Sequence, residues 1–305
     1  VFTVMSTNYS DAEMMRFTPR FLEQATEKVI REHSKTFFFA TGLLPRSSRK
    51  AIRALYAFCR ATDDLVDSEN ATLGDLQNWR CRINLPLEQQ DDLILYHWTQ
   101  IREAYGVNRR YEAELIEGVT RDAQFHPYQT WENLQTYCYQ VASTVGLLSM
   151  PIIGLADGVR FDQAAPYAIQ LGIALQLTNI LRDVGEDLTA GRVYFPLEDL
   201  DRFNLSLTDI QQRTFDERFI ALMQFEIARA RQLYQQALPG ITLLSRQARA
   251  AVGAAALLYA AILDEIEAIG YDVFYHRAHT NLFKKVRMLP GILWRVNHLA
   301  APQLD

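Results

Sequence analysis

Residues 54–67 read ALYAFCRATDDLVD, and this stretch sets the fold and the chemistry of the chain. Asp63 and Asp67 lie four positions apart, so on an α-helix they project from the same face. Tyr56 and Arg60 precede Asp63 by seven and three positions and extend that face backwards by two turns. The remaining positions are largely apolar, which is typical of a buried helix. Two carboxylates on such a surface repel each other unless a cation lies between them.

A second acidic stretch, residues 175–187, reads LQLTNILRDVGED. Gln176, Asn179, Asp183 and Asp187 follow one another at steps of three and four, so on a helix they form one polar stripe. Mg²⁺ takes oxygen ligands of this kind, usually one or two carboxylates together with substrate phosphates and water. The two stretches therefore predict a pair of acidic helices that bind Mg²⁺, or Mn²⁺ in its place, together with a diphosphate.

Other interpretations of paired carboxylates fit less well. A single pair of this kind is usually a solvated helix face, but two pairs on apolar helices favour a metal site. A di-iron bundle uses Glu-x-x-His pairs, and none of the six histidines has a glutamate three positions earlier. An EF-hand requires glycine at its sixth position, and the segment that starts at Asp63 has Ser68 there.

Helical periodicity runs along the whole chain. The expected helices cover residues 20–33, 46–68, 91–106, 108–123, 130–150, 163–188, 207–238, 245–269 and 280–295. Proline or glycine occurs at the breaks between them, and no stretch alternates apolar and polar residues long enough to predict a strand. We therefore expect a single all-α domain, with an N-terminal extension at residues 1–19, the domain at 20–296 and a tail at 297–305.

Composition excludes several classes of protein. The 305 residues are 49% hydrophobic, enough for a large core. Thirty-one basic residues against 36 acidic ones give a net charge of −5, so no nucleic-acid partner is expected. Cys59, Cys81 and Cys138 lack the spacing of a zinc site or a disulfide framework, which favours a reducing compartment.

Two segments bear on localisation. The longest apolar run, residues 250–263, is too short to span a bilayer, and Asp11 and Glu13 lie where a signal peptide would be apolar. We therefore expect a cytoplasmic protein. Residues 273–304 contain no acidic residue, and their apolar side chains alternate with basic ones at Arg277, Lys284, Lys285, Arg287 and Arg295. This segment either contacts an anionic membrane surface peripherally or presents a basic face to water.

With these motifs in place, the chain resembles the squalene/phytoene synthase family, whose members join two isoprenoid diphosphates head to head. The matching stretches are HSKTF at 33–37, YAFCRATDDLVD at 56–67, YCYQVASTVG at 137–146, QLTNILRDVGED at 176–187, GRVYFP at 191–196 and YDVF at 271–274. They span roughly residues 20–290 in the order and spacing of the family.

The resemblance implies a helical isoprenoid-synthase bundle with a central apolar cavity and the two acidic motifs facing each other across its mouth. It assigns metal binding to Asp63, Asp67, Asn179, Asp183 and Asp187. It assigns substrate binding to Ser34, Lys35, Thr36, Tyr56, Arg60, Gln176, Asn179, Arg182 and Tyr259. It assigns catalysis to the four aspartates together with Tyr56, Tyr137 and Tyr259. Without the resemblance, Tyr259 has the pattern of an ordinary core residue.

The resemblance is strongest to the phytoene-forming members. It implies that two geranylgeranyl diphosphates condense through a cyclopropyl (prephytoene) diphosphate to 15-cis-phytoene, with release of diphosphate and without NADPH, as the first step of carotenoid biosynthesis. Two farnesyl diphosphates could instead give dehydrosqualene or squalene, because chain length depends on a cavity depth that the sequence does not locate. A non-catalytic assembly factor would be expected to lose motif aspartates, and all four are present. The oligomeric state stays open.

Overall fold

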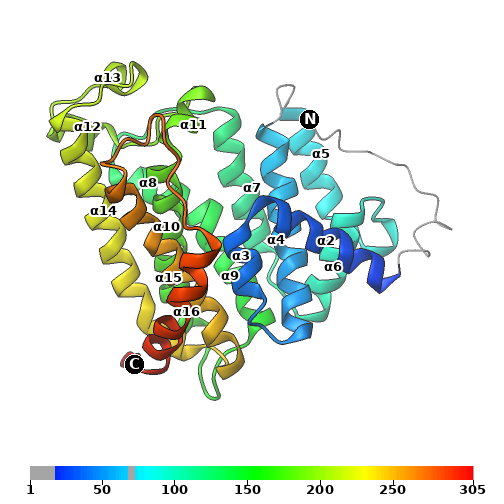
Figure 1. Cartoon of the computed structure of the whole chain (residues 1–305). Coiled ribbons are helices and arrows are strands. Elements are labelled where there is room, and N and C mark those ends of the chain that lie inside the picture. Colours follow the sequence, from blue (N-terminus) through cyan, green and yellow to red (C-terminus); the bar gives the residue numbers. More distant parts are fainter. Residues whose placement is uncertain (1–17, 68–72, 305) are drawn as a thin grey trace.

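The computed structural model describes residues 18–67 and 73–304, which fold into a bundle of helices (Figure 1). The helices are α2 (Pro19–His33), α3 (Lys35–Thr41), α4 (Arg46–Asp67), α5 (Leu73–Ile83), α6 (Leu93–Ala104), α7 (Arg110–Ala123), α8 (Trp131–Cys138), α9 (Thr144–Ile153), α10 (Phe161–Arg182), α11 (Val184–Thr189), α12 (Leu197–Arg202), α13 (Leu207–Gln211), α14 (Glu217–Ala237), α15 (Arg246–Ala268) and α16 (Leu282–Asn297). Short 3₁₀ segments lie at Leu87–Gln89 and Leu238–Leu243, and one π-helical turn lies at Tyr139–Ser143. Neither described range contains a strand beyond an isolated bridge between Leu155 and Leu244, which confirms the all-α prediction.

Several helix boundaries differ from the sequence expectation. Helices α3 and α5 form where no helix is expected. The expected helix at 207–238 is two helices, because Arg213 takes a positive φ of 57° and Asp216 then caps α14 by accepting from the backbone N–H of Arg218 and Phe219. The expected helix at 163–188 ends at Arg182 and resumes as α11. The periodicity of the apolar residues did not reveal these breaks, although Thr214 and Asp216 at the first and Gly185 at the second are poor helix formers.

Two groups of helices enclose the centre of the molecule. Helix α10 packs against α14 and α15, and their side chains form one hydrophobic cluster. Helix α4 packs against α6, α7 and α9 and forms a second cluster, in which the rings of Phe58 and Trp98 stack with centroids 5.4 Å apart. Burying one such ring stabilises the fold by roughly 1.5–3 kcal/mol. The two largest clusters of the core thus lie in an α10 half and an α4 half of the bundle, and smaller clusters accompany them.

A π-helical turn at Tyr139–Ser143 lies between α7 and α10 and spaces them. A Cβ at Gly118 of α7 would lie 2.6 Å from Gln140 Cβ, and one at Gly172 of α10 would lie 2.4 Å from Ser143 Cα. Both glycines are therefore required by close contact with the turn. Ser143 also donates from Oγ to Ile169 O at 2.7 Å, which fixes the turn against α10. Such π-turns widen a helix and often occur at functional sites.

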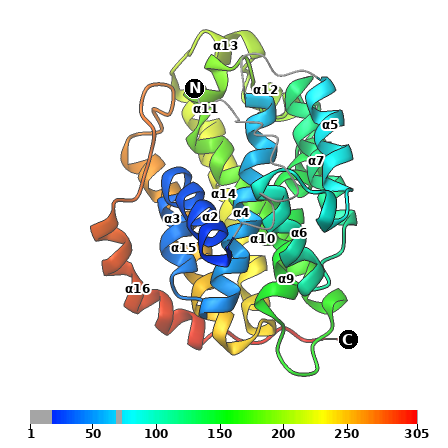
Figure 2. The same cartoon turned by 90° about the vertical axis from the view of Figure 1, so that its right-hand side faces the viewer.

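Helix α16 lies on the outside of the bundle and packs against α15 (Figure 2). Its buried face includes Lys285, Ile292 and Val296. Within the two described ranges, none of the helices combines the length and the apolar character that crossing a bilayer requires. The three cysteines carry free thiols, of which Cys59 and Cys138 are buried.

Candidate active site

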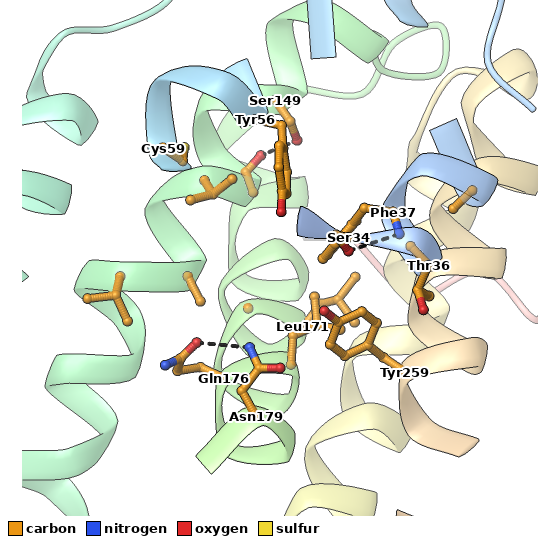
Figure 3. A pocket seen from close by; sticks show the side chains of 18 of the residues that line it. Ser34, Thr36, Phe37, Tyr56, Cys59, Ser149, Leu171, Gln176, Asn179 and Tyr259 are labelled. Atoms are coloured by element: carbon orange, nitrogen blue, oxygen red, sulfur yellow. Dashed lines mark hydrogen bonds between the residues drawn. The ribbon is translucent and has the colours of Figure 1, made fainter. Parts of the chain in front are cut away.

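A cavity of about 990 Å³ lies between the α4 half and the α10 half of the bundle. Its lining includes all but one of the residues that the sequence assigned to the site: Ser34, Lys35, Thr36, Tyr56, Arg60, Asp63, Tyr137, Gln176, Asn179, Arg182, Asp183, Asp187 and Tyr259. The side chain of the remaining residue, Asp67, lies outside the described part of the chain. Figure 3 shows Tyr56, Gln176, Asn179 and Tyr259 around the same space.

The first acidic motif lies at the C-terminal end of α4. Asp63 lines the cavity, whereas the next residue, Asp64, forms an ion pair with Arg60. Two turns before Asp63, burial raises the pKa of Tyr56 well above its usual value, and the nearby Tyr259 and Asp63 add to the shift. The Phe37 ring lies 5.1 Å from the Tyr259 ring and 6.3 Å from the Tyr56 ring, measured between centroids. Aromatic side chains thus line the cavity beside this motif.

The second acidic motif bends where the sequence predicted one straight helix. Asp183 lies between α10 and α11 with φ −103° and ψ 14°. The cause is a close approach by the segment after α15: Gly185 N donates to Val273 O at 3.2 Å, and a Cβ at Gly185 would lie 2.4 Å from Phe274 O. The polar stripe nevertheless stays continuous, because Gln176, Asn179, Asp183 and Asp187 all line the cavity.

The charges around the second motif are unevenly compensated. Asp183 accepts from Arg182 Nε at 2.7 Å and from Arg277 Nε at 2.9 Å. Burial lowers the pKa of Arg182, but the bonded Asp183 outweighs it and raises the pKa overall. Burial and the charge of Asp183 raise the pKa of Asp187 to about 8, despite the opposing effect of Arg192. A further cation near Asp187 would therefore stabilise its ionised form.

These residues fit a magnesium ion that is shared with a substrate. Asn179 Oδ1 is buried and has no hydrogen-bond partner among the residues that the structure describes, while Asn179 Nδ2 donates to Gln176 Oε1 at 3.3 Å (Figure 3). Over residues 18–67 and 73–304, no three His, Cys, Asp or Glu side chains form a ready-made metal cage. That arrangement suits Mg²⁺, which is usually bound by one or two carboxylates plus substrate phosphates rather than by an all-protein cage.

Basic residues from several segments line the cavity. Lys35 comes from α3, Arg60 from α4 and Arg182 from α10. Arg277 and Lys285 also line the cavity, although the sequence analysis placed them only in the basic C-terminal segment. Lys285 is 5% exposed and makes no ion pair within the described ranges, and burial followed by the charge of Lys35 lowers its pKa. An anion with several charges would be well compensated here.

Ser34 and Thr36 flank Lys35 at the start of α3. Ser34 Oγ accepts from Phe37 N at 3.3 Å and caps the helix. Away from the charged groups, the cavity wall is apolar, with side chains from α9, α10, the 3₁₀ segment Leu238–Leu243 and α15, among them Val145, Leu171, Leu175, Ile241 and Val252. Such a wall excludes water and suits hydrocarbon chains. The cavity thus has a polar end, at the C-terminal ends of α4 and α10, and an apolar remainder.

Tyr137 lies at the polar end beside two residues that the sequence analysis did not assign, Asp122 and Tyr194. Tyr137 Oη donates to Asp122 Oδ2 at 2.7 Å, and Tyr194 Oη donates to Asp122 Oδ1 at 2.8 Å. Asp122 and Arg192 also line the cavity. No sequence signal marks Asp122, because its partners come from other segments, whereas Tyr194 lies in the quoted stretch 191–196.

Comparison with known proteins assigns the family. The family model "Squalene/phytoene synthase" matches residues 30–284. The chain is 42% identical over 289 residues to the 15-cis-phytoene synthase of Synechocystis sp., covering 90% of this chain and 85% of the relative. It is 40% identical over 285 residues to the 15-cis-phytoene synthase of Synechococcus elongatus, covering 89% and 92%.

Solved structures agree with the family match. The crystal structure of a dehydrosqualene synthase in complex with a ligand superposes with a TM-score of 0.83 at 28% identity, covering 94% of this chain and 98% of that one. This likeness confirms the predicted helical isoprenoid-synthase bundle. The sequence motifs, the cavity that they line and these matches agree, and the chain belongs to the squalene/phytoene synthase family.

Proposed function

We propose that this protein is a 15-cis-phytoene synthase, which condenses two geranylgeranyl diphosphates head to head and releases diphosphate in the first step of carotenoid biosynthesis. One observation carries the proposal: a single cavity holds both acidic motifs at a polar end and continues into an apolar interior. The relatives that share 40–42% identity with this chain are named phytoene synthases, whereas the dehydrosqualene synthase shares 28%.

The polar end binds the two diphosphates. Asp63, Asp67, Asn179, Asp183 and Asp187 would hold Mg²⁺, or Mn²⁺ in its place. When bound, the ion supplies Lewis-acid stabilisation of the departing diphosphate. Lys35, Arg60 and Arg182 neutralise the same charge by charge-assisted hydrogen bonds. Ser34, Thr36 and Gln176 orient the substrates around them.

The apolar part of the cavity protects the carbocation. Loss of diphosphate leaves an allylic cation that water would convert to an alcohol, so the wall must exclude water. The rings of Phe37, Tyr56 and Tyr259 stabilise the cation by about 0.5–2 kcal/mol each. The double bond of the second substrate attacks the cation and, after proton loss, gives the cyclopropyl (prephytoene) diphosphate. A second ionisation, rearrangement and proton loss then give phytoene without NADPH.

Product analysis tests the proposal directly. The protein is incubated with Mg²⁺ and either geranylgeranyl or farnesyl diphosphate, with and without NADPH. A forty-carbon hydrocarbon made from geranylgeranyl diphosphate without NADPH supports phytoene synthesis. A thirty-carbon product from farnesyl diphosphate alone would instead indicate dehydrosqualene synthesis, and one that requires NADPH would indicate squalene synthesis. Absence of every hydrocarbon would favour a non-catalytic assembly factor.

The catalytic unit in this proposal is residues 20–296, with the N-terminal extension 1–19 and the tail 297–305 outside it. The protein acts in the cytoplasm and contacts a membrane peripherally through α16. One face of α16 exposes a row of apolar side chains, among which Phe283 is 75% and Trp294 65% exposed. Arg287 and Arg295 are exposed on the same helix. Apolar and basic groups together bind an anionic lipid surface.

A further inference from the structure

Two tyrosines bind the carboxylate of Asp122 at the polar end of the cavity, and a third tyrosine ring packs against both of them. The Tyr137 and Tyr194 rings stack with centroids 5.3 Å apart and an interplanar angle of 24°. Tyr128 packs against both, with centroid distances of 5.5 Å to Tyr137 and 6.2 Å to Tyr194. One carboxylate oxygen of Asp122 accepts a hydrogen bond from the Tyr137 hydroxyl at 2.7 Å, and the other accepts one from the Tyr194 hydroxyl at 2.8 Å. The carboxylate is thus held in one orientation by two phenols.

Helix stability does not explain an acid at this position. Asp122 lies in the last turn of α7, where the negative end of the helix dipole disfavours a carboxylate. The hydroxyls of Tyr137 and Tyr194 require partners because both side chains are buried, yet a neutral acceptor would satisfy them. A carboxylate supplies in addition a negative charge and a place for a proton.

The hydroxyl groups of Tyr137 and Tyr194 both use their protons in hydrogen bonds to Asp122. A phenol carries one proton, and each of these phenols donates it to its nearest acceptor, an oxygen of the carboxylate; Tyr137 Oη also lies within a longer 3.4 Å of Tyr194 Oη. Burial, followed by the charge of Asp122, raises the pKa of both tyrosines far above the usual value, so both remain neutral. Tyr137 Oη therefore has only lone pairs to offer to a group in the cavity that its side chain lines. Beside a carbocation, Tyr137 is a hydrogen-bond acceptor and a weak base.

We propose that Asp122 is a positioning residue for the final proton loss and receives the proton through Tyr137. Tyr137 Oη takes a proton from the carbon next to the cationic centre, and the electron pair of that C–H bond becomes the new double bond. The hydroxyl proton of Tyr137 passes at the same time to Asp122 Oδ2. The cation becomes a neutral hydrocarbon, Tyr137 stays a neutral phenol, and Asp122 becomes a neutral carboxyl group that returns its proton to solvent after product leaves.

This inference rests on the proposed function, because it concerns the proton loss that ends phytoene synthesis. The test compares Asp122→Asn, Tyr137→Phe and the double variant in the full chain with Mg²⁺ and geranylgeranyl diphosphate. Hydrocarbon formation should fall about 100-fold in each single variant, the usual contribution of a general base, with KM for the substrate nearly unchanged. The double variant should be no slower than Tyr137→Phe, because both substitutions interrupt one relay.

A second readout separates the relay from a structural role. The primary isotope effect with substrate deuterated at the carbon that loses the proton should increase in Asp122→Asn, because proton transfer becomes slower than the other steps. The cyclopropyl diphosphate should accumulate, or water-quenched alcohols should replace hydrocarbon. Tyr194→Phe is the matched control, since it removes the other phenol from Asp122 and leaves the bond to Tyr137; it should lose much less activity.

Three outcomes would overturn the relay while leaving the proposed function intact. The first is normal hydrocarbon formation by Asp122→Asn, which would indicate that the departing diphosphate is the base. The second is a double variant that is about 100-fold slower again than either single variant. The third is a rise in KM, with kcat unchanged, in the single variants. If Asp122→Asn fails to fold, Asp122→Glu keeps the carboxylate and should retain more hydrocarbon formation than Asp122→Ala. Equal activity of these two variants would also contradict the relay. Failure of the unaltered protein to make a hydrocarbon would instead reject the proposed function.

Discussion

Arg277 Nε donates to Asp183 Oδ1 at 2.9 Å, across 94 positions of sequence. The segment after α15 thus neutralises part of the second acidic motif and forms part of the same cavity wall. Because a diphosphate brings its own negative charge to this place, Arg277 can exchange a carboxylate partner for a phosphate partner without losing charge compensation.

Replacing Arg277 should weaken substrate binding more than it slows the reaction. In Arg277→Gln we expect KM for the isoprenoid diphosphate to rise about tenfold, which corresponds to 1.4 kcal/mol, with a smaller change in kcat. Arg287→Gln is the control, because Arg287 is exposed on α16 and does not line the cavity. Steady-state kinetics with both variants measure the effect. Equal KM values in the two variants would show that Arg277 neutralises the charge of Asp183 but does not contribute to substrate binding.

Removing an aspartate that lines the cavity should abolish turnover. We expect Asp63→Asn and Asp183→Asn to lose about 100-fold or more in hydrocarbon formation, as removal of a group that stabilises transition-state charge does. Asp64→Asn is the neighbouring control, because Asp64 pairs with Arg60 and does not line the cavity. Thermal unfolding should show that all three variants fold. Near-normal turnover in both Asp63→Asn and Asp183→Asn would reject the site assignment.

Raising the pH should destabilise the metal-free protein through Asp187. Burial and the charge of Asp183 raise the pKa of Asp187 from 3.8 to about 8. A carboxyl group whose pKa is higher in the folded state contributes stability at low pH and loses that contribution as the pH rises through the folded value. The thermal midpoint in EDTA should therefore fall between about pH 4 and pH 8, and it should fall less steeply in Asp187→Asn.

Adding Mg²⁺ with an unreactive diphosphate analogue should remove the difference in pH dependence between the unaltered protein and Asp187→Asn, because a bound cation favours the ionised carboxylate. Burial also raises the pKa of Glu226 to about 8, so a shared slope should remain in both proteins. Identical slopes in EDTA for the unaltered protein and Asp187→Asn would contradict the prediction.

The exposed face of α16 should bind anionic membranes. Phe283→Ser combined with Trp294→Ser should reduce co-sedimentation with vesicles that contain phosphatidylglycerol, because two exposed apolar anchors are lost. Point substitutions are preferable to deletion, since α16 also supplies Lys285 to the cavity. Phe215→Ser removes a partly exposed ring elsewhere and serves as the control. Equal sedimentation of the double variant and the control would reject membrane contact through α16.

The sequence motifs selected residues that lie together around one cavity, whereas the course of the chain around that cavity was harder to predict. On a regular helix the spacing of the residues determines the face on which each one lies. The position of Asp63 in its motif was therefore sufficient to predict that it lies on the cavity side of α4. The break at Asp183 was not predictable, because its cause is the backbone at Phe274, which approaches Gly185 from far along the chain. Local pattern contains no information about such a contact.

Two further residues show the same limit. Lys285 belongs to a basic segment that reads as solvent-exposed, yet the packing of α16 on α15 buries it in the cavity wall. Asp122 has no motif of its own and gains its role only when α8 and the segment before α12 bring two phenols to it. Tertiary neighbours determined the surroundings of both side chains, and those neighbours are distant in sequence.

The two glycines that clear space for the π-helical turn restrict how this enzyme can change its substrate. Gly172 brings α10 against the backbone of the turn at Ser143, and Gly118 brings α7 against the Cβ of Gln140 and a methyl group of Val141. Neither glycine can therefore be exchanged for a larger residue without moving the turn. Adaptation to a longer or shorter isoprenoid is left to lining side chains outside this contact, such as Met150 of α9, Tyr167 near the start of α10 and Ile241 after α14, where a single residue can alter the available length.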